Sequence, residues 1–121
     1  MFPHSYALEK LSTAVRILAT GEGDARSRLI SAFSAFGFLQ ADAFPPALQA
    51  DYESIKKEIT KRLPMSDEER SEWATDGDAH ANVRRMKNRT ASQIATKIYD
   101  LEHRVRIVYE EWRDNLLRSS R

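Results

Sequence analysis

The chain of 121 residues has no cysteine and only four glycines and four prolines. The lack of cysteine excludes disulfide bonds, thiolate metal ligands and cysteine nucleophiles. The scarcity of glycine and proline, together with few strand-like alternations, argues against a sandwich or a barrel. No apolar run is long enough to cross a bilayer, so we expect no membrane association.

The remaining composition is that of a folded protein in water. Hydrophobic residues make up 41% of the chain and charged residues 31%, which is too apolar for disorder. A chain of this size buries about two-thirds of its surface on folding, so residues 1–121 are expected to form a single domain. The start Met1–His4 has no cationic segment, and we therefore expect a cytoplasmic protein.

Charge is distributed unevenly along the sequence. Met1–Asp78 holds 9 Lys and Arg against 13 Asp and Glu, whereas Ala79–Arg121 holds 10 against 5. The net charges of these two parts are −4 and +5, which together give the net charge of +1. An acidic partner, if there is one, would be attracted to the C-terminal third.

Apolar residues recur every three or four positions in the N-terminal part of the chain, and this spacing predicts two helices there. The first covers Tyr6–Thr20, with Ser5 as its N-cap and Gly21 at its end. The second begins after Asp24, whose carboxylate caps the first N–H groups, and ends at Gly37. The short connection predicts that these helices pack on each other.

The third shorter helix is predicted to start at the pair Pro45–Pro46 and to end before Pro64. Its apolar residues again follow helical spacing. The segment Met65–Asp78 is polar, acidic and rich in turn residues. We expect it to form a mobile loop, with one short helix as an alternative.

The C-terminal segment predicts the longest element. Its apolar residues stay in phase at 100° per residue, which favours one continuous helix from about Asn82 to Leu117, roughly 54 Å long. Such a helix exceeds a domain of this size, so one end protrudes or a second subunit covers it, and we expect a homodimer. The alternative takes Thr90–Gln93 as a capping box that starts a new helix, leaving Asn82–Arg89 as a separate short one.

The spacing from Ile94 to Trp112 is that of a heptad repeat, but it covers fewer than three heptads. A bundle helix facing the shorter helices is therefore preferred, and self-association through this stripe or its flank is the alternative. Ile107 points away from the stripe, which suits either a partner contact or a singly exposed side chain. The predicted core comprises Leu8, Leu11, Val15, Leu18, Leu29, Phe33, Phe36, Tyr52, Ile55, Ile59, Ile94, Ile98, Leu101, Val105, Val108 and Trp112.

A basic cluster is the candidate binding site. Arg84, Arg85, Lys87 and Arg89 precede the long stripe and lie on the side of the helix away from it. Arginine and lysine bind phosphates, so the cluster is a candidate nucleic-acid contact. However, the four residues spread over about 200° of the helix and no aromatic residue lies among them, which favours a solvated face.

No catalytic or metal motif stands out. His4, His80 and His103 are too scattered for a metal site. The segment Gly21–Arg26 lacks the Gly-Lys-Ser/Thr ending of a phosphate-binding loop, and no strand precedes it. This segment is better explained as an interhelical turn, and no serine lies in a nucleophile elbow. We therefore expect neither metal nor cofactor and no enzymatic activity.

Two strings resemble a group of short uncharacterised bacterial proteins. They run from Leu18 to Leu29 and from Arg85 through Ile94 to Tyr99. The resemblance spans most of the chain and departs most in the segment Met65–Asp78. It implies a bacterial or mobile-element origin, near phage-defence genes, and it assigns no activity to any residue.

The sequence as a whole predicts an all-α fold, a small bundle of three shorter helices packed on one long C-terminal helix. The preferred function is a small non-catalytic protein that acts through protein–protein contacts, and a homodimer is among the expected partners. The alternative is a nucleic-acid-binding module that uses the four basic residues. Binding assays with protein and nucleic-acid partners would separate the two.

Overall fold

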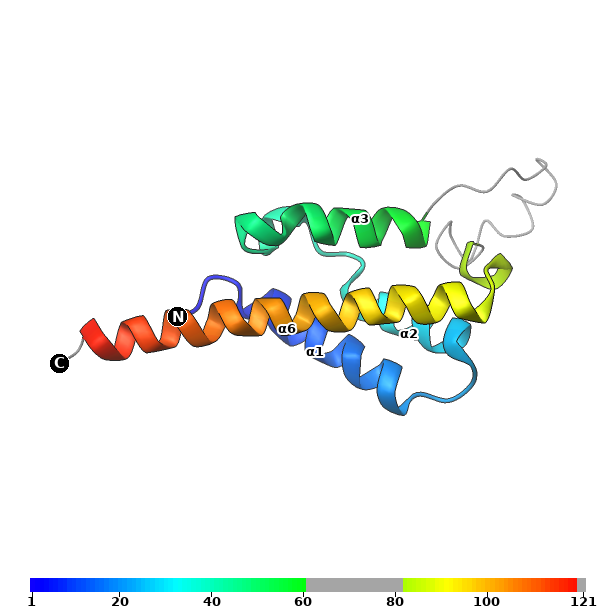
Figure 1. Cartoon of the computed structure of the whole chain (residues 1–121), viewed down its shortest axis with the longest axis horizontal. Helices are drawn as coiled ribbons and strands as arrows, with labels where there is room; N and C mark the ends of the chain where they lie inside the picture. Colours follow the sequence, from blue (N-terminus) through cyan, green and yellow to red (C-terminus); the bar gives the residue numbers. More distant parts are fainter. Residues whose placement is uncertain (61–81, 120–121) are drawn as a thin grey trace.

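The described part of the chain is helical (Figure 1). The computed structural model describes residues 1–60 and 82–119, and these ranges contain no strand. Three shorter helices, α1 (Ser5–Thr20), α2 (Ala25–Phe36) and α3 (Gln49–Thr60), pack against the long helix α6 (Asn88–Ser119). The predicted all-α class with its long C-terminal helix is confirmed. The segment predicted as a loop, residues 65–78, lies outside the described residues.

Helices α1 and α2 begin and end nearly where the sequence predicted. Gly21 ends α1, its N–H donating to the Ile17 carbonyl oxygen at 2.7 Å, and a Cβ at Gly21 would lie only 2.6 Å from that oxygen. Gly23 in the following turn has φ of 86°, a conformation that favours glycine. The predicted N-cap of α1 is wrong, because Ser5 is the first helical residue and His4 takes the N-cap position, without a side-chain hydrogen bond that caps the helix.

The third helix has a two-part start. The pair Pro45–Pro46 opens a 3-10 turn, η2 (Pro46–Leu48), and α3 follows directly. A second 3-10 turn, η1 (Ala41–Ala43), precedes it. Proline suits such a first turn because its missing N–H would have no helical partner.

Tyr52 fastens α3 to the end of α2. Its hydroxyl donates to the carbonyl oxygens of Leu39 at 2.7 Å and Phe36 at 3.2 Å, and its ring stacks on Phe44 with centroids 4.1 Å apart. Burial raises the pKa of the Tyr52 hydroxyl to about 12. The hydroxyl therefore stays protonated and keeps donating at any physiological pH.

The predicted continuous helix from Asn82 to Leu117 is wrong at its start. Residues 82–85 form a separate helical turn, the helix breaks at Met86 and Lys87, and α6 begins at Asn88. The alternative, a short separate helix followed by a new one, is confirmed in kind, but the new helix begins at Asn88, two residues before the predicted start at Thr90.

The break has a tertiary cause. The Asn82 side-chain amide donates to the carbonyl oxygens of Glu58 and Ile59, at 2.8 and 2.9 Å, and thereby pairs carbonyls that the end of α3 leaves without helical partners. Val83 beside it is fully buried. These two contacts hold the turn 82–85 against α3 (Figure 1), off the axis of α6.

The core follows the predicted stripe. Ten of the sixteen predicted core residues are buried, and the other six pack against them. The prediction missed Phe2, Leu39, Phe44, Leu48 and Val83, and four fully buried alanines, Ala7, Ala14, Ala32 and Ala91. Alanine is a weak signal in a sequence because it is common on both buried and exposed helix faces.

We expect Val105→Asp to unfold the protein. Val105 is fully buried on α6, and an isolated buried charge costs several kcal/mol, which is comparable with the stability of a small domain. Circular dichroism should show loss of most helical signal at 25 °C. The matched control Ser92→Asp adds the same charge at an exposed position of α6 and should melt like the parent. Equal melting of both variants would contradict the packing.

Candidate functional site

The four predicted basic residues do not share one helix. Arg84 and Arg85 lie on the turn 82–85, Lys87 lies at the break, and Arg89 is in the first turn of α6. All four are exposed. The break thus divides the predicted cluster between two elements, and the helical geometry assumed for it is not present.

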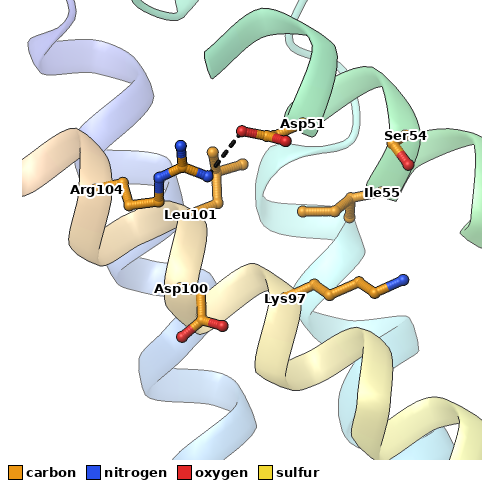
Figure 2. A pocket seen from close by; sticks show the side chains of 7 residues that line it. All are labelled: Asp51, Ser54, Ile55, Lys97, Asp100, Leu101 and Arg104. Atoms are coloured by element: carbon orange, nitrogen blue, oxygen red, sulfur yellow. Dashed lines mark hydrogen bonds and ion pairs between the residues drawn. The ribbon is translucent and has the colours of Figure 1, made fainter. Parts of the chain in front are cut away.

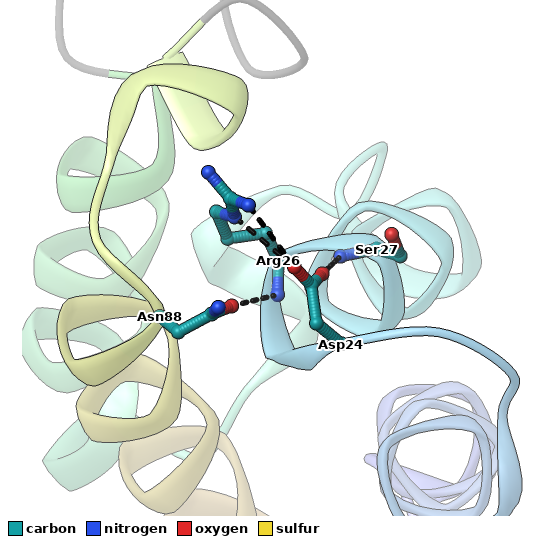
Figure 3. Close-up of polar contacts among 4 residues, drawn as sticks. All are labelled: Asp24, Arg26, Ser27 and Asn88. Carbon is teal, nitrogen blue, oxygen red and sulfur yellow. Dashed lines mark hydrogen bonds and ion pairs between the residues drawn. The ribbon is translucent and has the colours of Figure 1, made fainter.

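The start of α6 lies beside the start of α2 (Figure 3). The Asn88 side-chain oxygen accepts a hydrogen bond from the Arg26 backbone N–H at 3.4 Å. Neither helix has an acidic residue in its first turn, whereas Arg26 and Arg89 are located there. Because helix N-termini carry partial positive charge, this junction is electropositive.

Asp24 is the acidic residue that neutralises part of this positive charge. Its carboxylate accepts from the Ser27 backbone N–H at 3.0 Å and from the Arg26 guanidinium at 3.1 and 3.3 Å. The Ser27 hydrogen bond, and then that of Arg26, lowers the pKa of Asp24 to about 2. The predicted N-cap role of Asp24 is confirmed.

The glycine-containing segment Gly21–Arg26 was expected to be an interhelical turn; it holds the turn between α1 and α2, and Ala25 and Arg26 are already the first residues of α2. The Ser27 N–H at the start of α2 donates to Asp24, and the Arg26 N–H donates to Asn88. A phosphate-binding loop needs such N–H groups to be directed at the ligand. Here side chains of the same protein already accept from them.

A cavity of about 260 Å³ lies between α3 and α6 (Figure 2). An ion pair between Arg104 and Asp51 closes one side at 2.8 Å, and Lys97 pairs with Glu58 at 2.8 Å across the same two helices. The side chain of Ser54 supplies the hydroxyl of the lining, and no histidine lies beside it. Lys97 and Arg104 are thus each paired with a carboxylate of α3, and both pairs join α3 to α6. The cavity is lined by Asp51, Ser54, Ile55, Lys97, Asp100, Leu101 and Arg104.

A buried carboxylate was missed by the sequence reading. Glu102 on α6 is 5% exposed; it accepts from the Ser12 hydroxyl of α1 at 3.1 Å and pairs with Arg106 one turn on. Buried charges persist when they are paired and hydrogen-bonded. The sequence signal that could have indicated its burial is the position of Glu102 at the edge of the apolar stripe.

Helix α6 extends beyond the helices that cover it (Figure 1). Phe2 packs on Tyr109 and Trp112, with ring centroids 5.3 and 5.6 Å apart, and is the last large side chain over the stripe. Leu116 is in phase with the stripe yet 55% exposed. Within the single chain one end of the long helix therefore protrudes, as in one of the two expected arrangements; coverage of this end by a second subunit stays a prediction.

The side of α6 turned away from the core carries large apolar side chains. Tyr99 is 56%, Ile107 40% and Leu117 57% exposed. The expectation that Ile107 points away from the stripe is confirmed. Exposed charged or titratable residues lie between these three apolar residues along the helix. We define the outward face of α6 as Tyr99, His103, Arg106, Ile107, Glu110, Asp114 and Leu117.

The described residues contain no group of three or more histidines, aspartates and glutamates placed to hold a metal ion. Among them, no helix is both long enough and apolar enough to span a membrane. In comparisons with known proteins, no family model, curated protein or solved structure matches this chain.

We expect the Asp24 carboxyl to titrate near pH 2 in a carbon-detected NMR experiment, below its usual value of 3.8. Because folding lowers this pKa, the stabilisation that Asp24 provides is present above about pH 4 and is lost as the pH falls towards 2. The difference in melting temperature between the parent and Asp24→Asn should shrink over the same range. A titration midpoint at the usual value would mean that the cap is not formed in solution.

Proposed function

We propose that this is a small non-catalytic protein that acts through protein–protein contacts made by the long helix α6. The observation that carries the proposal is the outward face, where three large apolar side chains are exposed on one helix whose other side is buried. A singly exposed apolar residue needs no explanation, but several along one helix are typical of a contact surface.

The composition of this face supports the proposal. Aromatic and aliphatic anchors separated by charged residues resemble the mixed apolar and polar make-up of non-obligate interfaces. Tyr99 and Leu117 are two such anchors, and Arg106 and Glu110 are charged residues between them. Such a face can be exposed to water in the free protein and buried in a complex, as a non-obligate interface is.

The test is capture from a bacterial lysate, the host class that the resemblance implies, with three matched baits. Tyr99→Ser with Leu117→Ser removes two anchors of the outward face. Tyr6→Ser with Phe38→Ser removes another exposed aromatic pair, whose rings lie 6.3 Å apart away from α6. We expect proteins that bind the parent and the second variant to be lost with the first. Equal recovery on all three baits would contradict the proposal.

A second candidate function is nucleic-acid binding by Arg84, Arg85, Lys87 and Arg89. The observation that favours it is the electropositive junction of the α2 and α6 starts, where Arg26 and Arg89 occupy first turns that lack acidic residues. A phosphate would offset the unfavourable placement of Arg89 at the N-terminus of α6, whereas Arg26 is already paired with Asp24. Against it, the break distributes the four residues over two elements.

Salt dependence separates this candidate from a solvated face. If the four residues hold phosphates, the logarithm of the DNA affinity should fall with the logarithm of salt concentration, with a slope of about 0.9 per phosphate neutralised. Gln at all four positions should flatten that slope and leave the fold intact, since Gln keeps helix propensity. Gln at Arg16, Lys57, Arg113 and Arg118 removes the same charge elsewhere and should keep the slope. No binding by the parent at low salt would remove this candidate.

A further inference from the structure

Ile107, near the middle of the outward face, is bordered by carboxylates. Glu110 and Glu111 follow it by three and four positions, spacings at which side chains on one helix are neighbours. Asp100 and Asp114 lie seven positions before and after it, close to the same line along the helix. All four acidic residues are exposed. We call these four residues the acidic border of Ile107.

The cations of α6 near this border are already engaged within the chain. Each has a carboxylate partner: Lys97 with Glu58, Arg104 with Asp51, Arg106 with Glu102, and Arg113 with Asp114. Within residues 1–60 and 82–119, by contrast, the side chains of Asp100, Glu110 and Glu111 form no ion pair or hydrogen bond. His103 counts as neutral at pH 7. The charge left unpaired around Ile107 is therefore negative.

The positive surplus of the C-terminal third lies elsewhere. Of the ten Lys and Arg in Ala79–Arg121, four lie between residues 84 and 89 and four are the paired cations of α6. The other two are Arg118, about 16 Å from Ile107 along the helix axis, and Arg121. The attraction of an acidic partner thus applies to the start of α6 and not to the surroundings of Ile107.

We propose that the outward face of α6 binds a basic protein segment in which Lys or Arg residues flank an apolar side chain. The inference rests on the proposed function and specifies the chemistry of its partner. The apolar side chain packs on Ile107, which is 40% exposed. The flanking cations pair with Asp100, Glu110 and Glu111, the carboxylates that no group of the chain neutralises.

The sign of this charge disfavours other occupants of the face. A second copy of the chain presents the same three unpaired carboxylates, so two outward faces in contact bring like charges together. Nucleic acid carries one negative charge per phosphate and is repelled by the same carboxylates. A basic segment instead converts each carboxylate into an attractive contact, which speeds association and selects the partner.

Peptide binding tests the sign of the charge directly. Two labelled peptides of about 14 residues, one of Leu and Lys and one of Leu and Glu at the same helical spacing, are titrated with the parent protein. Fluorescence anisotropy at low salt should show binding of the Leu and Lys peptide, and at least about tenfold weaker binding of the Leu and Glu peptide. No binding of the Leu and Lys peptide, or equal binding of both, would overturn the proposal.

Matched variants locate the contact on the protein. Glu110→Gln with Glu111→Gln should weaken binding of the Leu and Lys peptide about fivefold at low salt, since exposed ion pairs contribute little each. The difference from the parent should shrink at high salt because salt screens exposed charges. Glu9→Gln with Glu53→Gln removes the same charge from exposed positions of α1 and α3 and should leave the affinity unchanged. Equal weakening by both pairs would mean attraction to the whole protein, and the proposal would fail.

The apolar contact has its own variant. Ile107→Ser should weaken binding of the Leu and Lys peptide at high salt as well as at low salt, because burial of apolar surface is not screened. Circular dichroism should show an unchanged fold, since Ile107 is exposed. An affinity equal to that of the parent would show that the peptide does not use this face.

Two further outcomes separate this inference from its alternatives. A parent with twice the 13.9 kDa chain mass in light scattering, reduced to the chain mass by Ile107→Ser, would place a second copy on the face and overturn the basic partner. Proteins captured through Tyr99 and Leu117 but recovered equally with Glu110→Gln and Glu111→Gln would also overturn it. That second result would still support the proposed function.

Discussion

The apolar stripe of α6 is the constraint on which the rest of the structure depends. At 1.5 Å per residue α6 is about 48 Å long, whereas α1 is about 24 Å and α2 and α3 are each about 18 Å long. All three shorter helices contact α6. None is long enough to cover the stripe alone, and at Trp112 it is Phe2, ahead of α1, that packs on the stripe. The exposed Leu116 is a direct consequence of this difference in length.

Polar contacts at the edges of the stripe decide where each shorter helix lies. The Ser12 hydroxyl and Arg106 satisfy Glu102 on the side of α1, while Arg104 pairs with Asp51 on the side of α3. Exposed ion pairs such as the second contribute little to the free energy of folding. Their effect is on position, because they select which flank of α6 each helix occupies and leave the opposite face uncovered.

The same arrangement separates the two candidate functions. The outward face keeps its anchors and charges on one rigid helix, so its geometry is set before any partner arrives. The basic residues are instead placed on a turn, a break and a helix start. A surface held in one geometry favours the protein–protein function, since less conformational entropy is lost when it binds.

Local patterns in the sequence determined the helices, the N-cap at Asp24, the end at Gly21 and most of the core. Each depends on residues a few positions apart, so periodicity and capping chemistry suffice to predict it. The outward position of Ile107 follows from the same periodicity. Even the protrusion of α6 could be inferred, because helix length and domain size are both set by residue number.

Only the tertiary structure decided the break before α6, the burial of Glu102 and the covering of Trp112 by Phe2. The break depends on Asn82 meeting carbonyls more than 20 positions earlier, and Glu102 is stabilised by Ser12, 90 positions away. Whether a polar side chain is buried depends on the partner that satisfies it. That partner comes from a different helix, so no local pattern specifies it.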